Sequence, residues 1–565
     1  MKTSLIHVPA ALARGWLSGC ALLVLAFSVF SHPALAATHY VRSDGGDATQ
    51  CNGSADAPYP GTGSGVACAW KHPFFALPPG GTPRIAGGDT LIIGPGNYMM
   101  GLGAPGAPSE TCAASWSYDC HMPAIPSGPS AAQKTRILGK GWDQGCTAAP
   151  QLWGTERADS IINLDGSSNV EIGCLEITDH NDCIEFHCST GACTGGASQI
   201  SQCPRENPPF GTWASVGIKA SASSNVWLHN LNIHGMANRG ILAGGLTDWT
   251  VENVKVRANG WAGWDGDIGA GSSNSGTQTF RGFDVSWNGC GERYPSGEIF
   301  GCWAQQAAGY GDGFGTARTG GNWVFEDSSF THNTSDGLDL LYADGTGTIT
   351  VRRVHSEGNA GNQIKTNGSA TIINSVVVAN CAYFEGKYNM TADDNCRALG
   401  NAVSLGMPAN TTVNLQYNTI TGQGDCLILN GAGAGSHLNV DDNVLIGAPD
   451  YWDGVHGNPE QSCLQYTDGN AIAVAFTRNF IWNVKGNACP AGSLCGMAPE
   501  IASSALSNFD ATPLPGSPLI DAADLSLSNP TDFYDQARPY GSANDLGAVE
   551  FRGTTSLEIF KDGFD

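Results

Sequence analysis

Two ten-residue segments near the middle of the chain, VFEDSSFTHN (residues 324–333) and TVRRVHSEGN (residues 350–359), decide the fold. Each alternates apolar and polar residues as a half-buried strand does, and each ends in asparagine, which tolerates the unusual backbone angles of a bend. Most copies start 21 to 29 residues apart. Further copies start at Val170, Val226, Thr250, Thr279, Thr371, Val413, Leu438 and Val474.

This repeat predicts an all-β chain that winds into a right-handed parallel β-helix. Each coil of such a solenoid buries its inward side chains only by stacking on its neighbours, and a period in the twenties with short strands fits it. Leucine-rich repeats are excluded by the missing leucine and asparagine signature, and propellers by repeats too short for four strands. The gaps of 45 residues after Thr279 and 42 residues after Thr371 predict coils of divergent sequence.

The alternation also predicts which side chains form the core. Residues on the inward side of each strand should be apolar, and the asparagines at the bends should stack in hydrogen-bonded ladders. The predicted inward residues include Val251, Ile349, Val351, Ile372 and Val440.

The N-terminus predicts export. Basic Lys2 and Arg14, an apolar run over residues 21–30 and small residues at 34–36 indicate a secretory signal peptide over residues 1–36. No later run reaches the roughly 20 apolar residues of a spanning helix. We therefore expect a secreted monomer without a membrane span.

Sequence features divide the rest of the chain. Openings and endings typical of secreted β-helix proteins frame the repeats, and a Gly/Pro/Cys-rich stretch interrupts the first coils. The predicted segments are a β-helix with an N-terminal cap at 37–510, a loop insertion at about 101–150, a closing segment at 511–552 and a tail at 553–565.

The cysteines indicate an oxidising compartment. Nineteen are present, and removal of Cys20 with the signal leaves an even number, which suits disulfide pairing. Zinc is a second interpretation for the ligand-rich residues 180–193, although disulfides are the commoner fate of cysteines outside the cell. The close pairs expected to tie loops are Cys51/Cys68, Cys112/Cys120, Cys290/Cys302, Cys381/Cys396 and Cys489/Cys495.

The net charge of −24 limits the partners. It argues against nucleic acid, which selects basic surfaces, and against unaided binding of any polyanion. An acidic polysaccharide would need a bridging cation, and Ca²⁺ is held by carboxylate oxygens. Such a substrate therefore implies Ca²⁺ as a cofactor.

Four stretches after the bends bring charged residues into register. These stretches are residues 238–242, 311–315, 335–339 and 361–365, aligned on successive coils. In this register Asp312 lies directly under Asp336, and Asp339 directly under Lys365. Parallel strands lie about 4.8 Å apart, so the three carboxylates are within reach of one cation. Strand alternation points Asp339 and Lys365 outward, onto one exposed face.

This pattern resembles the family 9 polysaccharide lyases, the β-helical pectate lyases. Their site combines an Asp-Gly-aromatic step, an Asp-rich step and a lysine one coil later. By this resemblance Asp312, Asp336 and Asp339 take the calcium positions, and Lys365 takes the position of the catalytic base. The chain departs from the family at Ser335, where a second acidic residue is usual. The change either weakens calcium binding or leaves the Ser335 hydroxyl as a neutral ligand.

The resemblance implies β-elimination on a uronate polymer, with pectate as the leading candidate. The reaction removes a weakly acidic C5 proton and stabilises an enolate-like charge, which calcium on the substrate carboxylate can do. A nearby divalent cation and partial burial favour the neutral form of Lys365, so we expect an alkaline optimum. Arg318, Arg352 and Arg353 are candidates to steady the substrate carboxylate, and Trp264 to stack on a sugar ring.

Two other functions stay open. Residues 333–337 and 363–366 faintly resemble the β-helical polygalacturonases, which are metal-free inverting hydrolases. Those enzymes need a further aspartate pair and a histidine between the two motifs, and the histidine found there, His355, has an ordinary repeat position. A non-catalytic surface adhesin would keep the fold and the disulfides without needing Lys365. Substitution of Lys365 separates these functions.

Overall fold

The computed structural model describes residues 36–185, 202–204, 207–303, 311–390, 394–451, 460–524 and 529–553. The predicted signal peptide, apart from Ala36, and the predicted tail, apart from Gly553, lie outside these residues. Within the described ranges, no helix is long and apolar enough to cross a membrane.

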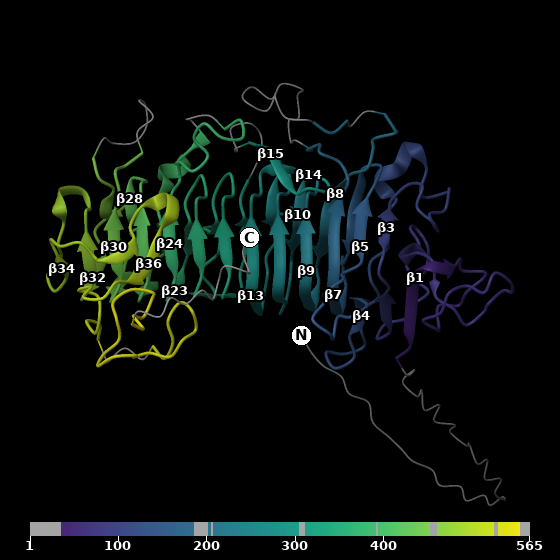
Figure 1. Cartoon of the computed structure of the whole chain (residues 1–565), viewed down its shortest axis with the longest axis horizontal. Coiled ribbons are helices and arrows are strands. Elements are labelled where there is room, and N and C mark those ends of the chain that lie inside the picture. Colours follow the sequence, from purple (N-terminus) through teal and green to yellow (C-terminus); the bar gives the residue numbers. More distant parts are fainter. Residues whose placement is uncertain are drawn as a thin grey trace, which may run out of the picture. The chain divides into compact units, whose positions relative to one another are not determined.

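Short strands stack in parallel to form a right-handed β-helix, as predicted (Figure 1). One sheet has ten strands, which follow the chain order. They are β6 (Ala158–Asn163), β8 (Ala214–Ser221), β10 (Arg239–Gly244), β12 (Ala262–Asp265), β16 (Phe314–Gly315), β19 (Leu338–Leu340), β22 (Ile364–Asn367), β25 (Val403–Gly406), β28 (Cys426–Asn430) and β31 (Cys463–Thr467).

A second sheet of 22 strands forms the other sides of the coils. Its strands are β1 (Thr38–Gly46), β2 (Thr90–Ile93), β3 (Asn97–Met100), β4 (Thr135–Gly139), β5 (Gln151–Gly154), β7 (Ser168–Asp179), β9 (Ser224–His234), β11 (Thr250–Arg257), β13 (Thr277–Ser286), β17 (Asn322–Glu326), β18 (Ser329–Thr331), β20 (Thr348–Arg352), β21 (His355–Glu357), β23 (Ser369–Ile373), β24 (Val376–Ala379), β26 (Thr412–Gln416), β27 (Thr419–Gly422), β29 (His437–Asp441), β30 (Val444–Gly447), β32 (Ala473–Thr477), β33 (Phe480–Trp482) and β34 (Leu494–Cys495).

Small elements decorate the loops. Two antiparallel hairpins and five short 3₁₀ turns occur in the described part of the chain. The hairpins are β14 (Cys290–Arg293) with β15 (Glu298–Cys302) and β35 (Ile501–Ser503) with β36 (Asp510–Pro513); the turns are η1 (Pro73–Phe75), η2 (Ala114–Asp119), η6 (Arg397–Gly400), η7 (Lys485–Asn487) and η8 (Leu506–Asn508).

The two long gaps in the repeat are loops and not divergent coils, so that prediction was wrong. Thr279 pairs directly with Val324, and Ala370 pairs directly with Val413. The first gap holds the β14–β15 hairpin, and the second holds a loop closed by the Cys381–Cys396 disulfide. The number of coils therefore has to be taken from the hydrogen-bonded strand pairing and not from the spacing of the repeats in the sequence.

The core follows the predicted alternation. All five predicted inward residues are at most 3% exposed. Phe314, Leu338 and Ile364 pair on adjacent strands of the ten-stranded sheet, and each is completely buried. Inward aromatic rings stack between coils, as Phe280 does on Phe325 at 4.7 Å between ring centroids. Burial of this apolar column stabilises each coil only if its neighbours are present.

The predicted asparagine ladder is present. Asn259, Asn288, Asn333 and Asn359 are fully buried, and each amide donates to the side-chain oxygen of the next, at 2.9, 2.9 and 2.8 Å. A second ladder joins residues 418, 443 and 479 at 2.9 and 3.1 Å. Buried amides need partners, so these ladders lock the register from coil to coil.

All five predicted disulfides form in the structure. Among the described residues, three more join Cys146 to Cys174, Cys183 to Cys203, and Cys426 to Cys463. Because Cys183 is disulfide-bonded, it is not a zinc ligand, and the remaining cysteines of the predicted zinc stretch lie outside the described residues.

The predicted loop insertion at 101–150 is shorter than expected, because β4 within it belongs to the solenoid. This strand pairs in parallel with β2 and β7. The remaining loop carries η2 and the Cys112–Cys120 disulfide.

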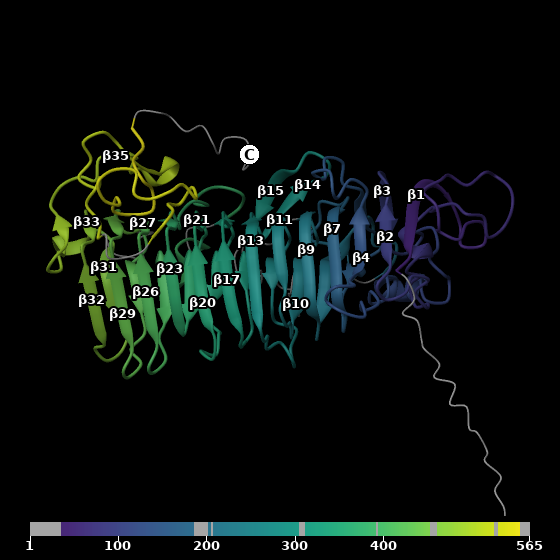
Figure 2. The ribbon, with the colours of Figure 1, turned by 90° about the horizontal axis from the view of Figure 1, so that it is seen from below.

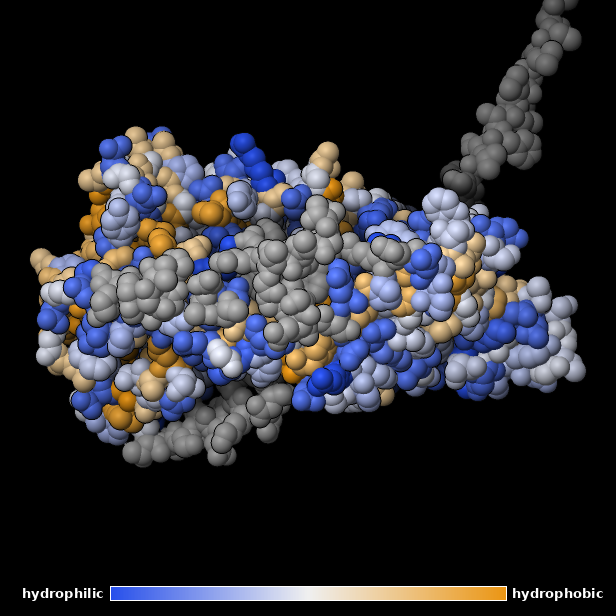
Figure 3. All heavy atoms as spheres, turned by 90° about the horizontal axis from the view of Figure 1, so that it is seen from above, coloured by the Kyte–Doolittle hydropathy of each residue, from blue (hydrophilic) through white to orange (hydrophobic). Residues whose placement is uncertain are grey.

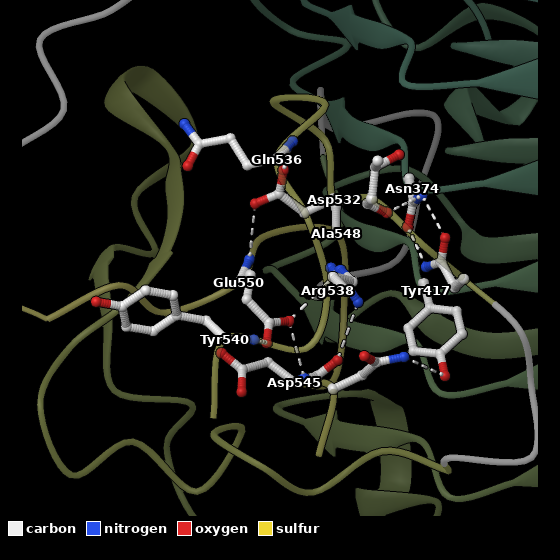
Figure 4. A network of polar contacts seen from close by, with 12 residues as sticks. Asn374, Tyr417, Asp532, Gln536, Arg538, Tyr540, Asp545, Ala548 and Glu550 are labelled. Carbon is white, nitrogen blue, oxygen red and sulfur yellow. Dashed lines mark hydrogen bonds and ion pairs between the residues drawn. The ribbon is translucent and has the colours of Figure 1, made fainter. Parts of the chain in front are cut away.

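The segment after β36 folds back along the C-terminal coils (Figure 2). Ala548 and Val549 pack with the outward Val376 and Val378 of β24. Inside the segment, the fully buried guanidinium of Arg538 donates to two backbone carbonyls and lies beside Glu550 (Figure 4). Hydrophilic and hydrophobic residues intermingle on the face shown in Figure 3, and hydrophobic ones gather toward the C-terminal coils.

Candidate active site

A column of aspartate and asparagine side chains runs along one corner of the coils. Asp312 Oδ1 accepts a hydrogen bond from the backbone N–H of Asp336 at 3.0 Å, and Asp336 Oδ1 accepts one from Asn362 at 2.7 Å. Asn362 Oδ1 accepts the same contact from Asn401 at 3.0 Å. One oxygen of each aspartate thus holds the next coil. Two coils after Asp312, the neutral Asn362 makes the same contact. Holding the next coil therefore does not explain why Asp312 and Asp336 are charged residues.

Asp339 and Lys365 lie beside each other on β19 and β22, in the predicted register. Lys365 Nζ lies 2.7 Å from Asp339 Oδ2 and 2.9 Å from Asp336 Oδ2. One carboxylate oxygen from each of Asp312, Asp336 and Asp339 lies within 4.8 Å of the others. The structure therefore brings the four predicted charged residues into one cluster.

The cluster is more buried than the sequence predicted. The side chains of Asp336, Asp339 and Lys365 are 4%, 8% and 11% exposed. Two loops pack on this corner: Thr334 Oγ1 donates to the carbonyl of Trp303 at 2.7 Å, and the backbone N–H of residue 397 donates to that of residue 360 at 3.0 Å. These loops do not follow the repeat, so strand alternation alone overstated the exposure.

Burial and charge divide the carboxyl groups. Burial raises the pKa of Asp312 well above its ordinary value, and the charges of Asp336 and Asp339 raise it further. Burial also raises the pKa of Asp339, although Lys365 opposes this. For Asp336, burial is outweighed by Lys365 and Arg397, and its pKa is lowered. Asp336 therefore favours the ionised form and Asp312 the protonated form.

Lys365 is held as an ammonium ion by its neighbours. Burial works to lower its pKa, but the charges of Asp336, Asp339 and Asp312 outweigh burial and raise it. This differs from the neutral amine expected from the sequence, because three carboxylates surround a single amine. Compensating positive charge is needed before Lys365 can accept a proton.

Arg397, which the sequence did not predict, also reaches the cluster. Its Nη1 donates to Ser335 Oγ at 2.5 Å. Arg397 begins η6, directly after the disulfide between Cys381 and Cys396. The sequence signal was the cysteine pair itself, which ties an arginine-bearing loop within the gap after Thr371.

The three carboxylates fit a divalent cation. Hard cations such as Ca²⁺ prefer several carboxylate oxygens within a few ångströms of one another, and Asp312, Asp336 and Asp339 supply them. Ser335 was predicted as a fourth ligand, but its hydroxyl accepts the hydrogen bond from Arg397. The positive guanidinium beside this oxygen disfavours a metal ion there.

The other predicted binding residues do not join the cluster. Trp264 is 1% exposed in the core and stacks on Phe314 at 5.4 Å between centroids, so it cannot stack on a sugar. Arg352 and Arg353 lie on and directly after β20, in the other sheet. They form ion pairs with Glu326 and Asp327 respectively. Arg318 is exposed beyond β16, at the strand end opposite Asp312.

The chain gives no match to protein-family models or to curated proteins. Among solved structures, pectate lyase Pel9A matches with a TM-score of 0.42 and 14% identity, over 91% of this chain and 96% of that one. A rhamnogalacturonan lyase matches with a TM-score of 0.38 and 13% identity, over 83% and 92%. The A-module of mannuronan C-5 epimerase AlgE6 from Azotobacter vinelandii matches with 0.31 and 10%, over 72% and 91%. At these values, likeness carries no information about activity.

Proposed function

We propose that this protein is a secreted polysaccharide lyase that cleaves a uronate-containing polysaccharide, pectate first, by β-elimination. One observation carries the proposal: Lys365 Nζ is fixed between Asp336 and Asp339, beside the third carboxylate, that of Asp312. The contact that Asp312 makes with the next coil does not require its charge. A buried amine with perturbed acids around it, near the surface of a solenoid, is typical of a reactive site.

The chain's own residues account for the proton transfer. Asp336 and Asp339 aim the amine, and neutral Lys365 takes the proton from C5 of the uronate. The C–H electrons form the C4–C5 double bond, the C4–O bond breaks, and the leaving oxygen takes a proton from water. Calcium bound by Asp312, Asp336 and Asp339 would supply positive charge that offsets these carboxylates and the carboxylate of the sugar.

The first experiment follows the ultraviolet absorbance of unsaturated uronate on pectate, alginate and glycosaminoglycans, with calcium and then with chelator. The expected result is a calcium-dependent rise with one polymer. Lys365→Ala should abolish it, a loss of about 1,000-fold or more. New reducing ends without absorbance would favour a hydrolase, and neither signal, with binding retained, would favour an adhesin.

A matched control is available in Lys219, which stands in the same register position of the ten-stranded sheet as Asp339 and Lys365. Lys219 lies on β8 of the same sheet and is paired with Asp159 at 2.7 Å. Register connects it through β10, β12 and β16 to Asp339 and Lys365. Lys219→Ala should keep full activity. An equal loss in both variants would mean that any lysine at this register position matters only for folding.

A further inference from the structure

One row of residues on the ten-stranded sheet passes through Lys365 and ends at an exposed tyrosine. The Lys365 row consists of the residues that pair in register with Lys365 from strand to strand. From β6 to β31 its members are Asn163, Lys219, Leu242, Asp265, Gly315, Asp339, Lys365, Ser404, Leu429 and Tyr466. Tyr466 is the one aromatic residue among these ten, and it is 56% exposed.

The two neighbours of Tyr466 on β31 show which way its ring points. Gln465 Nε2 donates to Asn430 Oδ1 at 2.6 Å, and Asn430 Nδ2 donates to Thr467 Oγ1 at 3.2 Å. Asn430 is completely buried, so both neighbours turn toward the inside of the coil. Because side chains alternate along a strand, the ring of Tyr466 points outward, to the side of the sheet on which Lys365 lies.

The position of Tyr466 relative to Lys365 is also fixed. A disulfide joins Cys426 to Cys463, the first residues of β28 and β31, which pair in register. Tyr466 lies three strands beyond Lys365, which is about 14 Å along the solenoid at the spacing of parallel strands. A polymer that lies along the row with one unit at Lys365 therefore reaches Tyr466 with a later unit.

The chemistry of this end of the row suits a sugar ring. Ser404 and Leu429, the two row members between Lys365 and Tyr466, are uncharged. The net charge of −24 works against binding of an acidic polymer. An aromatic ring offers a large apolar face that packs on the C–H groups of a sugar, whatever the charge of the sugar's carboxyl group. Stacking on Tyr466 therefore adds affinity that the overall charge does not cancel.

We propose that Tyr466 is a substrate-binding residue whose ring stacks on a sugar unit of the same polysaccharide chain that reacts at Lys365. The proposal rests on the proposed function. It implies that the polymer lies along the Lys365 row, parallel to the solenoid axis. It also implies that substrates long enough to reach Tyr466 bind more tightly than short ones.

Binding measured in a Lys365→Ala background tests this role, because the oligosaccharide then survives. The probes are trimers and hexamers of galacturonate and of mannuronate, titrated by calorimetry with calcium present. Tyr466→Ala should weaken binding of the preferred hexamer about three- to tenfold. Binding of the trimer should change less than twofold, since a trimer held beside the carboxylates ends before Tyr466. Tyr466→Phe keeps the ring and should keep the affinity for the hexamer.

Three results would overturn the assignment: equal weakening of trimer and hexamer, unchanged binding of the hexamer, or no binding of either hexamer before substitution. The matched control is Tyr540→Ala. Tyr540 is 62% exposed and belongs to the closing segment, which packs on the other sheet. Its loss should leave binding of the hexamer unchanged, and a loss of affinity equal to that of Tyr466→Ala would also count against a specific contact.

The position of cleavage gives a readout that a purely structural role of Tyr466 would not move. In the otherwise wild-type protein, Tyr466→Ala should raise KM for the hexamer and leave kcat unchanged, as expected for a contact made equally in the ground state and the transition state. It should also shift the bond that is cleaved in an end-labelled hexamer, because one binding position of the chain is lost. An unchanged cleavage pattern together with an unchanged KM would refute the contact.

The two proposals fail separately. If hexamers bind through Tyr466 but no unsaturated product is released, the lyase function falls and the sugar-binding role stands. If the product forms but Tyr466→Ala treats trimer and hexamer alike, the lyase function stands and the role of Tyr466 falls.

Discussion

Two clusters of buried charge, the candidate site and the closing segment, use the same residue types differently. In the closing segment, backbone groups meet the charges: Arg538 donates to the carbonyls of residues 545 and 547, and Asp532 accepts from the N–H groups of residues 534, 536 and 550. In the candidate site, carboxylates face one another and a single amine. Buried charge alone does not mark a site, whereas several carboxylates that face one another around a single amine favour one.

The largest effect should come from breaking the closing cluster. Arg538→Met should lower the free energy of unfolding by about 3–5 kcal/mol, because it leaves buried carboxylates and carbonyls without their donor. Activity per folded molecule should stay unchanged. Chemical unfolding measures the stability, and an activity assay at denaturant concentrations below the unfolding transition measures the activity per folded molecule. A loss of activity without a loss of stability would mean that the closing cluster does not differ from the candidate site in this way.

The candidate site should respond in the opposite way. Asp312→Asn keeps an oxygen for the N–H of Asp336, as Asn362 does for the next coil. It should lower activity about 100- to 1,000-fold. The unfolding midpoint should stay equal or rise, since an amide at this buried position never carries the charge that Asp336 and Asp339 oppose there. A drop in stability that matches the drop in activity would show that Asp312 serves only to hold the next coil.

A third cluster adds a titrating group to the comparison. Burial opposes the charged form of His234, but hydrogen bonds to Glu176 and Glu292 raise its pKa to about 9. This contact should stabilise the fold fully below pH 6.5 and lose about 3 kcal/mol as the pH rises through about 9. His234→Gln should remove that slope in unfolding experiments. A slope that persists in the variant would belong to other groups.

The smallest effect is expected at Arg318. This residue is exposed and lies at the far end of β16 from the cluster. Arg318→Ala should change kcat/KM by less than about twofold, as is usual for exposed positions away from a site. The same assay applied to Arg397→Ala compares it with a residue that reaches the cluster. A large loss of kcat/KM at Arg318 would mean that the substrate also contacts this end of β16.

The sequence predicted the parts of the molecule that obey the repeat. Val351 and Ile372 fall on the inward side because alternation and spacing define it, and Lys365 falls beside Asp339 because both stand at the same offset after a bend. Those offsets are enough to place the charged cluster.

The remaining parts lie outside the repeat. Arg397 sits in a loop whose length mimicked an extra coil, and only the disulfide and the backbone contacts decide where it points. Trp264 was misplaced because its coil, β12, lacks the Asp-Gly step used for alignment and lies between two coils that were taken as successive. The burial of Lys365 depends on these same loops.

The asparagine ladder has a consequence for how this protein evolves. Its members Asn259, Asn288, Asn333 and Asn359 are separated by 29, 45 and 26 residues, yet each contact has nearly the same length. Insertions and deletions between the ladder asparagines thus leave the hydrogen bonds between coils unchanged. Natural selection can lengthen, shorten or replace the loops around the carboxylates while the inherited alignment beneath them survives, so new preferences for sugars can arise without a new fold.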